Sequence, residues 1–194
     1  MKGERKNRQI SGRNLLMAAF LIAALILGSL MLQKYLASHS PSPLPARQAI
    51  EETVSVSLFF ASPDSGALVR ETRNIRPCDG ETSVCVREVL EELANGPIGD
   101  LAPTLPSNSI FRSVTINGDT AVINMGKEVI EGLPQGSSAE IAAAYSIVNT
   151  VSLNFPAIKR VKFQVEGLDA TTFRGHLDLR RPLEPDFKKE EMRG

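Results

Sequence analysis

The N-terminal part of the chain contains one long apolar run. Residues 15–32 hold no charged residue, and they follow a leader, residues 1–14, that carries five basic residues and a single acidic one. As a helix, this run would span roughly 27 Å, which is close to the thickness of the hydrocarbon core of a bilayer. Because basic flanks stay in the cytoplasm, the pattern predicts one transmembrane helix with the N-terminus inside and residues 33–194 outside.

A cleaved signal peptide is the alternative interpretation of this run. Signal peptides usually have a shorter apolar region, about 7 to 15 residues, followed by small residues at the cleavage site. Here the run leads into Gln33, Lys34 and Tyr35, and no cysteine lies nearby to carry a lipid. We therefore expect an uncleaved signal-anchor of the cytoplasmic (inner) membrane, with the rest of the chain facing the periplasm or exterior.

Beyond the anchor, the pattern divides the chain into three parts. Residues 33–52 are rich in proline and serine, which predicts an extended linker. Residues 53–183 alternate between strand-like and helix-like segments and are predicted to form one folded domain. Residues 184–194 are charged and nearly free of apolar side chains, so we expect a disordered tail.

Two hairpins are predicted from alternating apolar positions. Residues 54–60 alternate valine, leucine and phenylalanine with serine, and Pro63-Asp64-Ser65-Gly66 supplies turn residues before a second strand at 67–75. Residues 109–116 and 120–125 repeat this pattern around Asn117-Gly118-Asp119, a sequence that favours the positive φ angles of a tight turn.

Two helices are predicted from apolar positions at a spacing of three and four. Val86, Val89, Leu90 and Leu93 form one such stripe, which ends at Gly96-Pro97. A second helix is predicted from residue 137 to about 154. There Ser137 and Glu140 fit a capping box, and Pro156 ends the helix.

The last predicted elements are two strands. In residues 159–167, Val161, Phe163 and Val165 would face the core, and in residues 174–182 Leu177 and Leu179 would do the same. The predicted fold is therefore an α+β domain with two layers, in which two helices pack on a mostly antiparallel sheet.

Four segments follow one another in a distinctive order: VREVLEELANGP, LPSNSIFRSVTINGDTAVINMGKEV, AAAYSIVNTVSLNFPAIKRVKFQVEG and GHLDLRRPL. In this order they resemble the GerMN domain family of sporulation and germination proteins, over about residues 54–183. The resemblance implies a ring-building-motif-like domain on the outer side of a membrane, near peptidoglycan enzymes or sporulation machinery. It also implies no known catalytic activity.

Both cysteines lie in the segment predicted to be exported. Six residues separate Cys78 from Cys85, and neighbouring cysteines outside the cytosol are usually bridged. Free thiols are the alternative. A zinc site is disfavoured because structural zinc takes four ligands and the nearest downstream histidine is His176. We expect a structural disulfide, without metal or cofactor.

Charge argues against a nucleic-acid partner. The formal net charge is zero, but the leader holds an excess of basic residues, so the predicted exported part is net acidic. Binding to phosphates uses clustered cations. The chain also lacks tryptophan, so stacking on sugars is not indicated.

Few residues indicate catalysis. His176 and Asp178 would lie side by side on one face of a strand, as a base and its orienting carboxylate do, but no nucleophile or third metal ligand accompanies them. We interpret them as solvent-facing residues. Ser137 and Ser138 are interpreted as helix caps rather than nucleophiles, and Asp119 as a turn residue rather than a calcium ligand.

The second predicted helix carries no charge from residue 141 to residue 158, which is unusual for a surface helix. Its predicted core stripe is Ile141, Ala144, Tyr145, Val148, Val151, Ser152 and Phe155. The remaining face is then Ala142, Ala143, Ser146, Asn149, Thr150 and Leu153. This face either docks on a partner or lines a groove, or it is covered by the proline-rich residues 97–108.

The sequence thus predicts a non-catalytic binding or assembly module, anchored in the membrane and serving the cell envelope. Its partner would be an envelope protein or a second copy of the chain. A receptor for a small ligand or a peptidoglycan fragment is the alternative. An envelope hydrolase that uses His176 and Asp178 is the third and least favoured reading.

Overall fold

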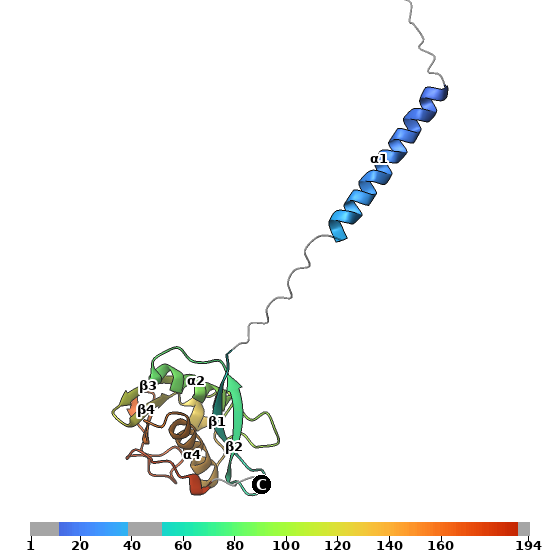
Figure 1. Cartoon of the computed structure of the whole chain (residues 1–194). Coiled ribbons are helices and arrows are strands. Elements are labelled where there is room, and N and C mark those ends of the chain that lie inside the picture. The colour runs from blue at the N-terminus through green and yellow to red at the C-terminus, as the bar shows by residue number, and fades with distance from the viewer. Residues whose placement is uncertain (1–11, 39–51, 190–194) are drawn as a thin grey trace, which may run out of the picture. The chain divides into compact units, whose positions relative to one another are not determined.

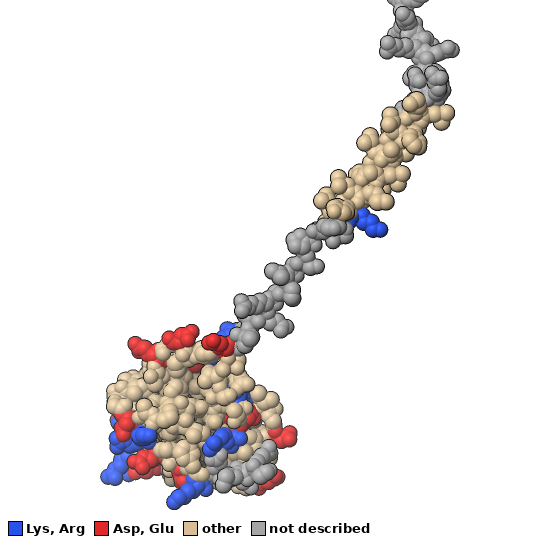
Figure 2. All heavy atoms as spheres, in the orientation of Figure 1, with Lys and Arg blue, Asp and Glu red and all other residues tan. Residues whose placement is uncertain are grey.

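The computed structural model describes residues 12–38 and 52–189, in two separate units that divide after Ile50. The first unit contains helix α1 (Gly12–Ser38). Its window Ala19–Leu36 is long and apolar enough to cross a membrane, and Figure 2 shows a mostly uncharged surface along the helix. An N-terminal signal sequence has the same length and composition, so the helix is a signal or an anchor. The predicted leader before residue 12 and linker residues 39–51 lie outside the described residues.

The domain begins with an antiparallel hairpin, as predicted, made of β1 (Val54–Ala61) and β2 (Leu68–Ile75). The turn is closed by a hydrogen bond from the Ser62 N–H to the Ala67 carbonyl, 2.8 Å between N and O. Gly66 lies in the turn at φ +71, a conformation that a side chain disfavours. The two strands form a sheet of their own.

Helix α2 (Thr82–Ala94) follows the cysteine segment. The four residues of the predicted stripe are all buried, and Gly96 adopts φ +83 just after the helix before Pro97 prevents its continuation. The sequence-based prediction of this helix and of its end is confirmed.

The second sheet has four strands in the order β3-β4-β5-β6. The hairpin of β3 (Phe111–Asn117) and β4 (Thr120–Met125) was predicted and is confirmed. Strand β5 (Arg160–Val165) runs parallel to β4, and the chain between them forms α3 (Glu128–Glu131) and α4 (Ser137–Asn154). The parallel pair follows from this crossover, because a strand that returns through a helix re-enters the sheet in the same direction.

The C-terminal part differs from the prediction. Strand β6 (Leu168–Asp169) is only two residues long, and residues 174–182 form no strand. Leu179 is buried and Leu177 is half-buried. The alternating apolar pattern of residues 174–182 therefore comes from side chains that face the core from an irregular segment, not from a strand. A disordered tail was predicted from residue 184, but residues 184–189 are ordered. There η1 (Phe187–Lys189) packs against the domain, with 6.1 Å between the ring centroids of Phe187 and Phe59. Residues 190–194 lie outside the described part.

Helix α4 lies between the two sheets, in contact with β1 on one side and β5 on the other, and α2 packs beside it (Figure 1). The fold is therefore α+β as predicted, but with two small sheets rather than one. In a helix enclosed on both sides, apolar and small residues are needed around most of the circumference. This position explains why α4 carries no charge after Glu140.

Candidate functional site

The residues predicted as an interaction face of α4 lie mostly in the interior. Ala143, Ser146, Asn149 and Thr150 have no exposed surface, whereas Ala142 and Leu153 are half-buried. Of the two interpretations, a docking face or a covered face, the second therefore holds for these four residues. Conversely, Ile141, Tyr145, Ser152 and Phe155 of the predicted core stripe are only half-buried.

Polar contacts with other parts of the domain account for the buried polar residues of α4. Asn149 forms two hydrogen bonds with the backbone of Asp186, at 3.1 Å from Nδ2 to the carbonyl and 3.0 Å from the Asp186 N–H to Oδ1. The hydroxyl of Thr150 accepts a hydrogen bond from the Phe59 N–H at 3.2 Å. The cover is thus β1 and the C-terminal segment, not the predicted residues 97–108.

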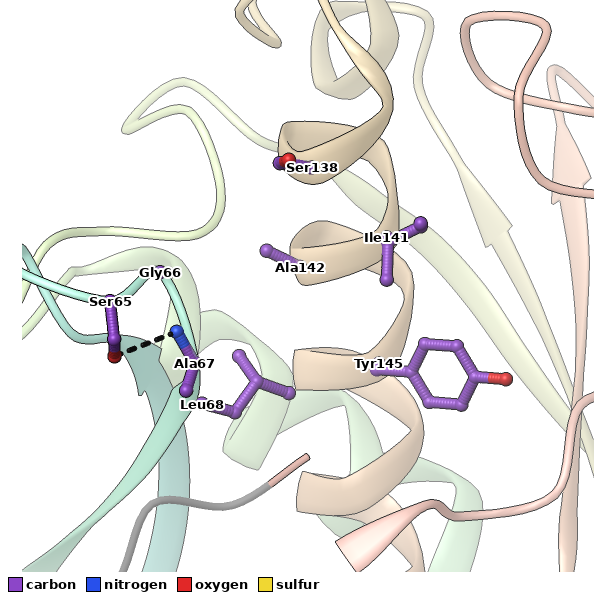
Figure 3. A pocket seen from close by; sticks show the side chains of 8 residues that line it. All are labelled: Ser65, Gly66, Ala67, Leu68, Ser138, Ile141, Ala142 and Tyr145. Atoms are coloured by element: carbon purple, nitrogen blue, oxygen red, sulfur yellow. Dashed lines mark hydrogen bonds between the residues drawn. The ribbon is translucent and has the colours of Figure 1, made fainter. Parts of the chain in front are cut away.

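One groove remains open beside α4 (Figure 3). Ser138, Ile141, Ala142 and Tyr145 line it from the helix, and residues 65–68 of the β1–β2 turn form the opposite wall. Its volume is about 310 Å³, and no charged residue lines it. The groove therefore suits a small uncharged group, and its lining contains no carboxylate, histidine or cysteine that could bind a metal.

A second cavity, of about 420 Å³, lies at the C-terminal end of α2. Four prolines line it, at positions 97, 103, 106 and 134, together with Thr104 and Gly132. Among the described residues, the buried hydroxyl of Thr104 has no hydrogen-bond partner. A Cβ atom at Gly132 would come within 2.7 Å of the Pro106 ring, so this wall of the cavity requires glycine.

Glu140 is completely buried, and it holds the segment after β6 in place. Its carboxylate accepts hydrogen bonds from the Thr172 hydroxyl at 2.6 Å and from the backbone N–H groups of Phe173 at 2.9 Å and His176 at 2.8 Å. Burial would raise the pKa of this carboxyl. These donors and the Arg174 N–H outweigh burial and lower the pKa to about 2.

The predicted capping box is therefore wrong. The residue before α4 is Gly136, at φ 120, and no side chain caps the helix. Glu140 turns inward, since the loop 172–176 offers it several donors, instead of reaching back to the start of the helix. Ser137 and Ser138 lie exposed in the first turn of α4 without a capping bond, and Ser138 lines the groove.

His176 and Asp178 do not form an acid–base pair. The Asp178 carboxylate accepts hydrogen bonds from the Arg180 side chain at 2.8 and 2.9 Å and from the Arg180 N–H at 3.0 Å. Its pKa is lowered to about 2, with the Arg180 side chain as the largest cause. In the described part of the chain no hydrogen bond joins the His176 side chain to Asp178, and both residues are exposed.

Asp119 belongs to the turn between β3 and β4, where it forms an ion pair with Arg160, 2.6 Å between Oδ1 and the guanidinium. This hydrogen bond to Arg160 is the largest cause that lowers the pKa of Asp119. Within residues 12–38 and 52–189, no group of three or more potential metal ligands comes together. The interpretation of Asp119 as a turn residue agrees with its position.

Cys78 and Cys85 form a disulfide, as predicted. The bridge ties the segment after β2 to the first turns of α2, because Cys85 lies within Thr82–Ala94. A cavity of about 200 Å³ lies beside it, between the ends of the hairpin and α4. This position fits a structural role for the disulfide.

The sequence analysis did not predict the arginine network under β2. Arg73 is buried and forms ion pairs with Glu71 and with Glu92, the latter at 2.7 Å, and it donates to the Gly96 carbonyl at 2.9 Å. Glu71 in turn accepts from the Ile98 N–H at 3.1 Å. These contacts fix the loop after α2. The one available signal for this network was the pair of opposite charges two positions apart in the predicted strand, Glu71 and Arg73.

The Germane family, described as "Sporulation and spore germination", matches residues 57–171, which is more than half of the chain. The chain belongs to the GerMN (Germane) family. The GerMN domain is not a known catalytic domain. A comparison with curated proteins gives no significant match.

Two solved structures of the sporulation protein GerM show a similar fold. The first GerMN domain of the sporulation protein GerM from Bacillus subtilis is 20% identical, with a TM-score of 0.52, and the match covers 69% of this chain and 96% of that one. The tandem GerMN domains of the same protein give 18% identity and a TM-score of 0.54, over 69% of this chain and 46% of that chain. A candidate lipoprotein from Clostridium perfringens is 25% identical, with a TM-score of 0.49, over 70% of this chain and 89% of that one.

Proposed function

We propose that this protein is a single-pass membrane protein that presents its GerMN domain outside the cytoplasm as a non-catalytic binding or assembly module of the cell envelope. The observation that carries the proposal is the combination of a membrane-length apolar helix with a separate domain that contains a disulfide. Disulfides persist in oxidising compartments and are rare in the cytosol. The location implied by the disulfide agrees with the orientation implied by the basic leader.

The described domain supports a binding role rather than a catalytic one. The groove beside α4 and the cavity at the end of α2 are both lined without charged residues. Asp178, the predicted partner of His176, is held by Arg180. The proposed partner is an envelope protein or a second copy of the chain.

A topology experiment tests the proposal. A phosphatase that is active only outside the cytosol, fused after Gly194, should be active, whereas a fluorescent protein that folds only in the cytosol should stay dark at the same position. The membrane fraction should contain the chain at its full mass. A soluble form that starts after residue 32 would show that α1 is a cleaved signal, and an active cytosolic reporter would overturn the proposed location.

A receptor for a small uncharged ligand is the second candidate, and the cavity at the end of α2 favours it. Its volume of about 420 Å³ lies within the range of ligand sites, and no charged residue lines it. Calorimetric titration with uncharged peptidoglycan sugars would test it. Heat that disappears in Ser107→Trp, which adds a large side chain at an exposed position of the cavity lining, would support the receptor, and no heat would exclude these sugars as ligands.

A further inference from the structure

The outer edge of β1 is closed by other parts of the domain. Asn154 of α4 acts like a neighbouring strand: its Oδ1 accepts from the Ser57 N–H at 2.9 Å, and its Nδ2 donates to the Ser57 carbonyl at 2.7 Å. Further along the edge, the Thr150 hydroxyl accepts a hydrogen bond from the Phe59 N–H. Ala61 and Ala102 are joined by two backbone hydrogen bonds of 3.0 and 2.8 Å. No further strand can join the hairpin on this side.

Among the described residues, no strand pairs with the outer edge of β2. Ser57 lies opposite Thr72, and because the backbone of Ser57 bonds to Asn154, this pair is one of those that exchange no hydrogen bond between β1 and β2. The N–H and C=O groups of Thr72 therefore point away from β1, as do those of Asn74 two residues on. Both residues are exposed, and among the described residues no hydrogen bond reaches these backbone groups. Figure 1 shows β1 between α4 and β2.

This edge lacks three of the usual protections against pairing. Proteins guard edge strands with proline, a bulge, a short strand or charged side chains, and β2 has only the last of these, in Arg70, Glu71 and Arg73. Strand β2 contains no proline, and its register with β1 runs through all eight pairs without a shift. The other long edge strand, β3, differs, because its register shifts between Phe111 and Ser113.

We propose that β2 pairs with β2 of a second copy of the chain, antiparallel and with the two-fold axis at Thr72. Charge disfavours the neighbouring registers. In this register Arg70 lies opposite Asn74, and the backbone of Glu71 lies opposite that of Arg73, while these two side chains keep the ion pair of their own chain. An axis at Arg70, Glu71 or Arg73 would instead place like charges opposite each other, which destabilises a strand pair. Ile98 is held against Glu71 by its N–H and is 79% exposed, so it supplies an apolar contact beside the same edge.

This inference names a partner for the proposed assembly module and builds on that role, but its test does not depend on membrane topology. Residues directly opposite in a hydrogen-bonded antiparallel pair have Cα atoms about 5.5 Å apart, within the range that a disulfide can bridge. The two native cysteines are bonded to each other, so Thr72→Cys adds a single thiol to the full chain. In mild detergent and mild oxidant, this variant should form a covalent dimer.

The register provides matched controls. Arg70→Cys alone and Asn74→Cys alone should give little covalent dimer, because each residue is then offset by four positions from its own copy. A mixture of the two variants should cross-link, because Arg70 lies opposite Asn74. Equal cross-linking at all three positions, or none at Thr72→Cys, would overturn the proposed pairing.

A proline variant tests the pairing without cross-linking. Thr72→Pro removes an N–H that β1 does not use, so the domain should keep its melting temperature while the full chain changes from dimer to monomer by light scattering. Thr72→Val keeps the N–H and should remain dimeric. A dimer that persists in a folded Thr72→Pro protein would overturn the proposal, and if this variant does not fold, the cysteine series decides. A monomeric wild-type protein whose reporter is still active outside would overturn the pairing but leave the proposed location intact.

Discussion

The carboxylate of Glu140 and the backbone N–H of His176 are joined by a hydrogen bond of 2.8 Å. The bond links the first turns of α4 to the segment after β6, which has almost no regular structure of its own. Together with the hydrogen bonds from Thr172 and Phe173, it allows one buried carboxylate to fix the position of the C-terminal part of the domain. Burying a charge is costly unless it is well paired, so the arrangement is sensitive to small changes.

Glu140→Gln should destabilise the domain by roughly 2 to 4 kcal/mol, because an amide accepts fewer of these bonds and buries an unpaired NH₂ group. Urea unfolding followed by circular dichroism measures the loss. Glu131→Gln is the matched control, because Glu131 is 64% exposed and its carboxylate forms an exposed ion pair with Lys127. Equal effects of the two changes would contradict the organising role of Glu140.

Glu140 should also contribute to acid sensitivity. Its pKa is about 2 in the folded domain, below the ordinary value of 4.5. A lowered pKa stabilises the fold above the ordinary value, and this contribution is lost as the pH falls from about 4.5 to about 2. The difference in unfolding free energy between the wild type and Glu140→Gln should therefore shrink over this window. A constant difference from pH 6 to pH 2 would contradict the assigned pKa.

Asn149→Lys should lower the melting temperature by several degrees. The change removes both hydrogen bonds to the Asp186 backbone and places a charge where no surface is exposed. Ala142→Lys, one residue after Ile141 in the half-buried wall of the groove, should cost within about 1 kcal/mol. Calorimetry on the two variants tests this. Similar melting temperatures would mean that Asn149 is not enclosed.

Removing the disulfide should cost about 2.5 kcal/mol. Replacing both Cys78 and Cys85 by alanine opens a ring of eight residues, and the chain-entropy model gives this value for a loop of that length. Urea unfolding of the variant and of the oxidised wild type measures the difference. The domain should still fold, because its core residues lie mainly in the sheets, α2 and α4. Unfolding of the variant in buffer would show that the staple is essential.

The sequence predicted most elements of the fold because their signals are local. The stripe from Val86 to Leu93, the Asn117-Gly118 turn and the alternation around Phe163 each lie within one element, and all three were confirmed. The split into two sheets and the parallel β4–β5 pair depend on contacts between distant segments, such as Ser57 with Asn154. Local patterns do not contain that information.

The candidate site was harder to predict than the fold. The uncharged character of α4 was recognised, but a helix between two sheets and a helix that docks on a partner have the same composition. Thr150 and Asn154 each bond to the backbone of a strand more than 90 residues away in the sequence. Glu140 was misassigned for the same reason, because its donors lie beyond residue 170. Only the position of the other segments distinguishes these roles.

The Asn154 side chain forms hydrogen bonds with both the N–H and the C=O of Ser57. These bonds also limit how large an assembly can grow. A hairpin with two open edges could add copies without end and form a fibre. Here one edge is already occupied by the helix of the same chain, so the hairpin can gain strands on one side alone. Pairing through β2 then ends at two molecules, and a single asparagine provides part of the barrier to polymerisation.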